Sequence, residues 1–381
     1  MSAGSDTVVA ADESGPAQTD SWQWIATDAE LARFAESARS NGSLAIDTEF
    51  VRRRTYHAEL GLVQLASAGR VYLLDPLALD ASAAIGDLLA APEVRKLIHA
   101  GGEDIEVLER WSGATPNNLI DTQIANQFSG VPGQIGYQRM VAERLDISLS
   151  KGEQQSDWMR RPLTQKQCRY AADDVRYLHP VADQILAEVD RLGRSDWLAE
   201  ECQRQIQRVL SDQPAYPHLA ERNAGSYSEI VQWRLCHLLR WREAEALQRD
   251  KPRNWILDAG LAVAIAHCAP SDDTALNRVL TEAGRRDPQR AAAKFSELLA
   301  QIEDQPDADF PIAPEPLDGA QKKSVKSLRA ALIDLAEPLG LAPEFIATRA
   351  ILEQAVRAGR WPESVGRWRS ALLAELDPSK H

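Results

Sequence analysis

The feature that most constrains the fold is an apolar stretch, residues 43–50, that runs into two acids, Asp47 and Glu49. Residues i and i+2 of a β-strand point to the same side of a sheet, so both carboxylates would project together from a buried strand. Two buried anions this close repel each other, and burying them is costly unless a cation neutralises them. Hard oxygen ligands of this kind suit Mg²⁺ or Mn²⁺. The simpler interpretation is two solvated acids at the end of a surface strand, and the motif alone does not exclude it.

The segments around this stretch predict an α/β domain. The apolar runs 60–66 and 70–74 are separated by a Ser-Ala-Gly turn, which together with residues 43–50 predicts an antiparallel meander. The predicted order is strands first, then alternating strands and helices, and then helices alone. This order is typical of an α/β domain. The elements expected after the meander are a helix at 83–89, a strand at 96–99, a helix at 103–111 and a long helix at 164–192, for which Thr164 is a suitable N-cap.

The 381 residues are too many for one ordinary domain, and changes in composition divide them. We expect an α/β domain with a mixed sheet flanked by helices, followed by two all-α helical-bundle domains. The predicted bounds are a disordered acidic tail at 1–21, the α/β domain at 22–205, a connector at 206–224, a helical domain at 225–303, an acidic, proline-rich linker at 304–318, and a second helical domain at 319–378.

The net charge of −13 is concentrated in two segments that hold no Lys or Arg. Residues 1–21 carry four acids and residues 301–318 carry six, so the rest of the chain carries only −3. Composition therefore neither supports nor excludes a polyanionic substrate. No apolar run is long enough for a membrane span, and the N-terminus does not have the pattern of a secretory signal.

The four cysteines are far apart and form no C-x-x-C pair. This spacing disfavours a zinc site and a disulfide framework, and it fits reduced thiols. Reduced thiols lead us to expect a cytoplasmic protein. Because no apolar run is long enough for a span, we also expect that it does not associate with a membrane.

Two further acids, Asp174 and Asp104, are candidates to join the pair on the first strand in one site. Tyr170 and Asp174 are four residues apart and share one face of the predicted helix, so the hydroxyl can orient a water that a metal on the carboxylate makes more acidic. Asp104 follows a strand and a Gly-Gly turn, in the first turn of a helix. The helix dipole favours a carboxylate there in any case, so Asp104 alone has a simpler interpretation. Jointly, four carboxylates on converging elements suit two divalent ions that clamp a phosphodiester.

These motifs, in this order, resemble those of the DEDD exonuclease superfamily, in the subtype with a tyrosine in its third motif. The flanking residues narrow the resemblance to ribonuclease D, and it covers about residues 22–376. The three motif regions lie at 47–52 with 60–65, at 99–108, and at 151, 156–158, 161–163, 170–174 and 177–178. The helical domains resemble the helicase-and-RNase-D C-terminal (HRDC) domain at 241–243, 252 and 255–256, and a degenerate second copy of it at 339–343 and 368–369.

The resemblance implies an RNase H-like fold and 3′→5′ hydrolysis of RNA that releases nucleoside 5′-monophosphates, with tRNA precursors and other structured RNAs as substrates. It implies two divalent ions, Mg²⁺ or Mn²⁺. Carried over by position, Asp47, Glu49 and Asp174 would hold the ion on the side of the nucleophile. Asp47 and Asp104 would hold the other ion, and Tyr170 would orient the attacking water.

Three other residues near these motifs have weaker claims to a role in the site. Asp173 is one helical step from the Tyr170 face and is left out. His99 is expected to pack or hydrogen-bond near the end of its strand. Arg52 is the candidate for a phosphate contact, against the simpler interpretation of a solvated loop.

Two other functions stay open from the residues alone. A four-carboxylate site acts on the phosphate backbone and not on the sugar, so a DNA 3′→5′ exonuclease is an alternative. A non-catalytic RNA-binding scaffold built on the helical domains is another. The expected partner is RNA, and the working expectation for the chain itself is a monomer, although the sequence does not decide its oligomeric state.

Overall fold

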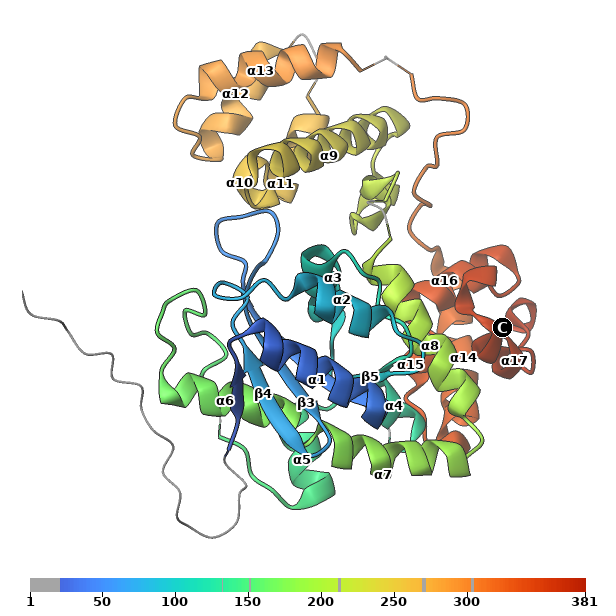
Figure 1. Ribbon diagram of the computed structural model, residues 1–381. Helices are drawn as coiled ribbons and strands as arrows, with labels where there is room; N and C mark the ends of the chain where they lie inside the picture. Colours follow the sequence, from blue (N-terminus) through green and yellow to red (C-terminus); the bar gives the residue numbers. More distant parts are fainter. Residues whose placement is uncertain (1–20, 132, 151, 212–213, 269–271, 303–304) are drawn as a thin grey trace, which may run out of the picture.

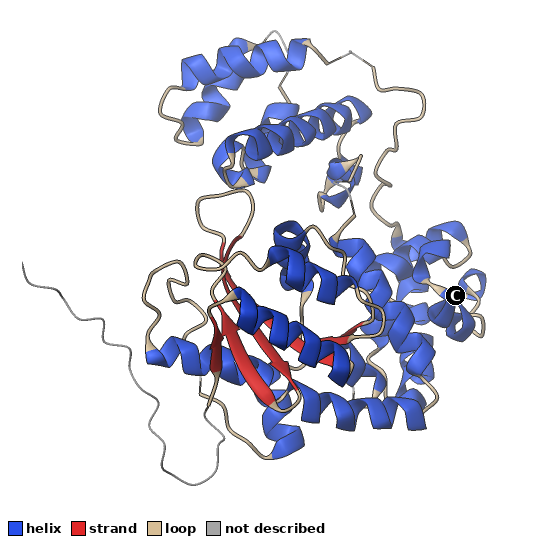
Figure 2. Cartoon of the chain, viewed as in Figure 1, coloured by secondary structure: helices blue, strands red, loops and turns tan. Residues whose placement is uncertain are grey.

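The computed structural model describes residues 21–131, 133–150, 152–211, 214–268, 272–302 and 305–381. The tail predicted at 1–21 therefore lies outside the described residues, apart from Ser21. In the described part of the chain, strands occur only in the N-terminal domain, and helices make up the regular structure of the rest (Figure 2). None of the helices in these ranges is long and apolar enough to cross a membrane.

One mixed sheet organises the N-terminal domain. Within the described residues it has six strands in the order β1-β4-β3-β2-β5-β6. The antiparallel pairs β2–β3 and β3–β4 confirm the predicted meander, while β1–β4, β2–β5 and β5–β6 are parallel. The strands are β1 (Gln23–Ile25), β2 (Ser43–Val51), β3 (Glu59–Ser67), β4 (Arg70–Leu74), β5 (Arg95–Ile98) and β6 (Leu119–Asp121).

Helices cover both faces of this sheet, which explains why its strands are apolar on both sides (Figure 1). On one face, Ile46 and Leu65 share a core with Phe34 of α1, Ile85 of α2 and Leu108 of α3. On the other face, strand residues that include Ala45 and Ala66 pack against α6 and α7. The helices of the domain are α1 (Asp28–Asn41), α2 (Ser82–Ala90), α3 (Gly102–Ser112), α4 (Thr122–Phe128), α5 (Tyr137–Leu145), α6 (Gln165–Arg176), α7 (Leu178–Arg191) and α8 (Ser195–Val209).

The single helix predicted at 164–192 is wrong, because the chain forms α6 and α7 with a break at Tyr177. Its predicted start is confirmed: Thr164 caps α6, and its side chain accepts a hydrogen bond from the backbone N–H of Gln167. Pro180 lies in the first turn of α7. Proline has no backbone N–H, and its ring excludes the carbonyl four residues earlier, so a regular helix cannot run through this point.

The second helical unit has its own core. It consists of α9 (Glu229–Arg249), α10 (Arg253–Ile256), α11 (Ala259–Ala266), α12 (Asp273–Glu282) and α13 (Pro288–Ala300), and its buried residues form a separate cluster. Before it, α8 continues four residues past position 205, where we placed the domain boundary, and Ile206 packs into the core of the sheet domain. The segment expected to be a linker is anchored, since Phe310 is buried, stacks on His218 at 4.7 Å and packs edge-on against Trp233.

The third helical unit shares its core with the sheet domain. Its helices are α14 (Gly319–Ala336), α15 (Pro343–Ile346), α16 (Arg349–Ala358) and α17 (Arg367–Leu373). Trp368 of α17 stacks on Trp197 of α8 at 5.4 Å and packs edge-on against Phe128 of α4 at 5.1 Å. A buried ion pair at 2.5 Å joins Arg369 to Glu201 in the same contact. The third unit and the helices α4, α5, α7 and α8 of the sheet domain therefore share one continuous hydrophobic core.

Candidate active site

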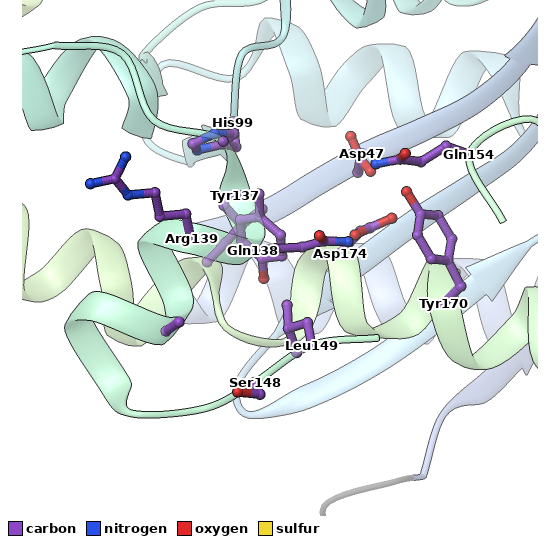
Figure 3. Close-up of a pocket in the computed structure, with 13 residues that line it drawn as sticks. Asp47, His99, Tyr137, Gln138, Arg139, Ser148, Leu149, Gln154, Tyr170 and Asp174 are labelled. Atoms are coloured by element: carbon purple, nitrogen blue, oxygen red, sulfur yellow. The ribbon is translucent and has the colours of Figure 1, made fainter. Parts of the chain in front are cut away.

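Three separate elements bring the predicted site residues together. Asp47 and Glu49 lie on one face of β2, Asp104 lies in the first turn of α3, and Asp174 lies in the last turn of α6. Tyr170, one turn before Asp174, points into the same space, and the close-up shows it facing the Asp47 and Asp174 side chains (Figure 3). All five residues that the sequence pointed to thus meet at one place.

The charges of these carboxylates disturb one another. Burial, and then repulsion by the charges of Asp104, Asp174 and Glu49, raises the pKa of Asp47 well above its ordinary value. Burial and the charges of Asp174 and Asp104 raise the pKa of Glu49 to about 9. Burial also raises the pKa of Asp174 to about 7 and that of Asp104 to about 6. The cluster therefore holds protons at neutral pH unless a cation replaces them.

This donor set fits divalent metal ions. All of the ligands would be carboxylate oxygens, which Mg²⁺ and Mn²⁺ prefer, and a cation would relieve the mutual repulsion. As the side chains stand, the described part of the chain contains no group of three or more His, Cys, Asp or Glu that could hold an ion. The Asp104 carboxylate accepts a hydrogen bond from the hydroxyl of Thr48.

A cavity of about 570 Å³ opens beside the carboxylates (Figure 3). Among the four acids, Asp47 and Asp174 line it and Glu49 and Asp104 do not. A volume of this size is typical of a site for a small molecule or a single nucleotide. The rest of its lining includes His99, Tyr137, Gln138, Arg139, Ser148, Leu149, Gln154 and Tyr170.

Tyr170 stays a neutral hydroxyl at all working pH values. Burial, followed by the charges of Asp174, Glu49 and Asp47, raises its pKa further above the ordinary value. The hydroxyl forms a hydrogen bond with the Asp174 carboxylate. Asp173, which we left out of the site, instead forms an ion pair with Arg176 at 3.0 Å.

This chain is similar in sequence to known exonucleases. A family model described as a 3′-5′ exonuclease matches residues 22–190. Ribonuclease D of Xanthomonas oryzae pv. oryzae is 37% identical over 351 residues, which are 92% of this chain and 96% of that protein. Ribonuclease D of Escherichia coli K12 is 31% identical over 371 residues, which are 93% of this chain and 96% of that protein. This chain belongs to the ribonuclease D family.

Solved structures agree with this assignment. The crystal structure of Escherichia coli ribonuclease D, described as an exoribonuclease involved in structured RNA processing, superposes with a TM-score of 0.82. The match covers 93% of this chain and 97% of that chain at 31% identity. The catalytic core of RRP6 from Trypanosoma brucei shares the fold, with a TM-score of 0.55 and 20% identity over 74% of this chain and 80% of that chain. The predicted α/β fold and 3′→5′ exoribonuclease class are thereby confirmed.

Two basic side chains near the ribonuclease D motifs already have partners. Arg52, the candidate for a phosphate contact, lies 2.9 Å from Glu106 of α3 in an ion pair that is partly exposed. Arg53 donates a hydrogen bond to the carbonyl of Gln155. A phosphate that contacts Arg52 would have to compete with Glu106 for its guanidinium.

His99 has the structural role that the sequence suggested. Its Nδ1 lies 2.9 Å from the Thr122 hydroxyl and its Nε2 lies 3.2 Å from the Ile135 carbonyl. Burial lowers its pKa, so the ring is neutral at physiological pH.

Two residues that sequence reasoning did not assign to the ribonuclease D site lie within it. Gln64 of β3 pairs in register with Asp47 and is fully buried, yet among the described residues neither atom of its amide has a hydrogen-bond partner. The available signal was a polar residue in the middle of the apolar run 60–66. Tyr137 lines the cavity opposite Tyr170, and no local pattern marks it.

Proposed function

We propose that this chain is a metal-dependent 3′→5′ exoribonuclease that removes one nucleotide at a time by a two-metal mechanism. The observation that carries the proposal is the meeting of four mutually repelling carboxylates and a neutral tyrosine beside a cavity of nucleotide size. Membership of the ribonuclease D family supports the same activity.

Each side chain of the site has a role either in holding an ion or in orienting the attacking water. Asp47, Glu49 and Asp174 would hold one ion, and Asp47 and Asp104 would hold the second. When bound, the ions would lower the pKa of the attacking water and neutralise charge on the phosphate and the leaving oxygen. Tyr170 remains protonated, so its hydroxyl can orient that water next to Asp174. The cavity receives the 3′-terminal nucleotide, which leaves as a nucleoside 5′-monophosphate.

The substrate we propose is structured RNA with a single-stranded 3′ end, tRNA precursors in particular. The match to Escherichia coli ribonuclease D, which is described as an exoribonuclease involved in structured RNA processing, supports structured RNA as the substrate. We propose the domain organisation given above, with the two HRDC-like units at 225–303 and 319–378, and a monomeric chain. The four cysteines are free thiols, which supports a cytoplasmic location.

The test is to incubate a 5′-labelled RNA hairpin bearing a single-stranded 3′ tail with the protein and Mg²⁺, Mn²⁺ or a chelator. We expect stepwise shortening from the 3′ end that requires metal, is lost in Asp47→Asn and is strongly slowed in Tyr170→Phe. A 3′-phosphate on the RNA should block the reaction, which separates it from endonuclease cleavage.

Two other outcomes would decide for the alternatives. Equal turnover of a matched DNA strand would make the chain a general 3′→5′ exonuclease. Tight RNA binding with no shortening in either metal would contradict the catalytic proposal and favour an RNA-binding scaffold.

A further inference from the structure

The break between α6 and α7 contains the hydroxyl of a residue from a third helix. Tyr137, the first residue of α5, donates a hydrogen bond from its hydroxyl to the backbone carbonyl of Asp173 at 3.0 Å. The same hydroxyl accepts a hydrogen bond from the backbone N–H of Tyr177 at 3.2 Å. In an uninterrupted α-helix the N–H of residue 177 would bond directly to the carbonyl of residue 173. The hydroxyl of Tyr137 is therefore inserted into the position of one backbone hydrogen bond.

Pro180 does not account for this insertion. Proline at position 180 removes the bond from its own nitrogen to the carbonyl of Arg176. It leaves the bond between residues 177 and 173 free to form. Side chains that insert into the backbone ladder are a recognised cause of helix kinks. Tyr137 thus opens the helix three residues earlier than the proline requires.

This insertion acts directly on a site residue. The carbonyl that Tyr137 holds belongs to the peptide group between Asp173 and Asp174, so it fixes the plane of the peptide whose nitrogen is that of Asp174. The orientation of this plane sets the direction in which the Asp174 side chain leaves the helix. The close-up shows Tyr137 and Asp174 next to each other at the cavity, with Asp47 beyond (Figure 3).

We propose that Tyr137 is a positioning residue for Asp174: its hydroxyl, inserted between the carbonyl of residue 173 and the N–H of residue 177, aims the Asp174 carboxylate at Asp47. The inference rests on the proposed function, in which Asp174 is a metal ligand. Partners that orient metal ligands typically contribute about 10- to 100-fold to metal affinity or activity. Without the hydroxyl, the direct backbone bond forms and Asp174 rotates away from Asp47.

The experiment compares Tyr137→Phe with the wild-type protein. Mn²⁺ binding to the RNA-free protein is followed by electron paramagnetic resonance, alongside kcat and KM for the tailed hairpin RNA. We expect the Mn²⁺ concentration at half-saturation to rise by roughly 10-fold or more. The kcat measured at subsaturating Mn²⁺ should fall by a similar factor. The KM for RNA should stay within about twofold, because the ring still lines the cavity.

A matched control and a rescue separate positioning from packing. Tyr72→Phe removes a hydroxyl from a tyrosine that packs against Phe34 at 4.9 Å on the sheet, and it should leave Mn²⁺ binding unchanged. Replacing Tyr137 with 4-aminophenylalanine puts an N–H donor and a lone pair where the hydroxyl was, and it should restore most of the lost Mn²⁺ affinity. Amide hydrogen exchange at Tyr177 should change in Tyr137→Phe and return in the rescue variant.

The outcomes distinguish this inference from the function on which it rests. If the wild-type protein shows no metal-dependent shortening of RNA, the proposed function fails. If the wild type is active and Asp47→Asn is inactive, but Tyr137→Phe binds Mn²⁺ as the wild type does, the role of Tyr137 is overturned and the function stands. A loss of Mn²⁺ affinity that 4-aminophenylalanine does not rescue would also overturn it, because packing alone would then explain the loss.

Discussion

At the scale of single residues, the buried carboxylates of the site destabilise the metal-free fold. Each buried carboxylate whose pKa is raised holds a proton in the folded state that it releases when the chain unfolds. The folded state therefore binds more protons than the unfolded state between about pH 4 and pH 9. The free energy of unfolding of the metal-free protein must then fall as the pH rises through this window.

A pH series tests this account. We expect the rise in Tm caused by saturating Mg²⁺ to be larger at about pH 8 than at about pH 6, because the ions displace fewer protons from Glu49 and Asp174 at the higher pH. Asp47→Asn should reduce this gain at both values, since it removes one ligand. Thermal unfolding with and without metal provides the measurement. An equal gain at the two pH values would contradict the assigned cause of the pKa shifts.

Gln64 provides a second test at this scale. A buried amide without a partner costs about 1–3 kcal/mol, so Gln64→Leu should leave the free energy of unfolding unchanged or raise it. The same variant should lower metal-dependent turnover by roughly 10-fold, because the amide faces Asp47 across the strand pair. Urea unfolding and the RNA assay measure the two effects.

Gln232 is the matched control for this variant. It is also buried, but its amide donates to the carbonyl of Tyr227 at 3.0 Å and accepts from the N–H of Ala313 at 2.7 Å. Gln232→Leu should therefore cost about 1–3 kcal/mol of stability and leave turnover intact. Similar stability losses in both variants would show that Gln64 has a structural partner.

The sequence predicted those candidate site residues whose grouping shows in local spacing. Asp47 and Glu49 follow the two-residue period of a strand, and Tyr170 and Asp174 follow the four-residue spacing of a helix face. Tyr137 could not be found in this way. Its partners are 36 and 40 residues away, so only the packed structure brings them together.

At the scale of elements, the segment 156–163 before α6 is clamped to the sheet. Arg161 donates hydrogen bonds to both carboxylate oxygens of Asp75, at 2.6 and 2.8 Å, and to the carbonyl of Gly61 at 2.6 Å. Trp158 is buried directly against Gly61, where a Cβ would stand 2.7 Å from the tryptophan carbonyl oxygen. The position of α6, and with it Tyr170, therefore depends on this contact.

Gly61→Ala tests the clamp. The added methyl group should displace Trp158 and lower the free energy of unfolding by about 1–3 kcal/mol, as overpacked sites do. It should also reduce kcat, because α6 begins immediately after the displaced segment. Gly319→Ala is the control, since a Cβ there meets no atom within 4 Å. Wild-type turnover in Gly61→Ala, with its stability reduced, would show that the clamp does not position α6.

Element boundaries were predictable where a local signal marks them. The cap at Thr164 and the meander followed from residue type and alternation. The break at Tyr177 was missed even though Pro180 is visible in the sequence, because the apolar pattern of the helix continues across it.

At the scale of the molecule, both helical units are fastened to the sheet domain. Tyr56, in the loop that follows β2, donates a hydrogen bond from its hydroxyl to Glu243 of α9 and accepts one from Arg253 of α10 at 3.0 Å. Its backbone N–H donates to Asp250 at 3.0 Å. The second unit is thus held by the continuation of the strand that carries Asp47 and Glu49. No sequence period predicts such contacts, because they join polar residues nearly two hundred positions apart.

The shared core of the third unit predicts coupled unfolding. Trp368→Ala should cost about 3–5 kcal/mol and destabilise the sheet domain as well, because Trp368 is 3% exposed and contacts Phe128 and Trp197. Trp255→Ala is the control, since Trp255 is 56% exposed. Urea unfolding followed by circular dichroism measures both. Loss of the third unit alone, with the sheet domain as stable as before, would contradict a continuous core.

The most direct test of the whole account is the number and position of bound metal ions. Anomalous diffraction from crystals of Tyr170→Phe soaked with Mn²⁺ and a short RNA would locate them. We predict two peaks, one contacted by Asp47, Glu49 and Asp174 and the other by Asp47 and Asp104, with the phosphate that links the last two nucleotides of the RNA between them. A single peak, or peaks away from these carboxylates in a protein that still shortens RNA in Mn²⁺, would contradict it.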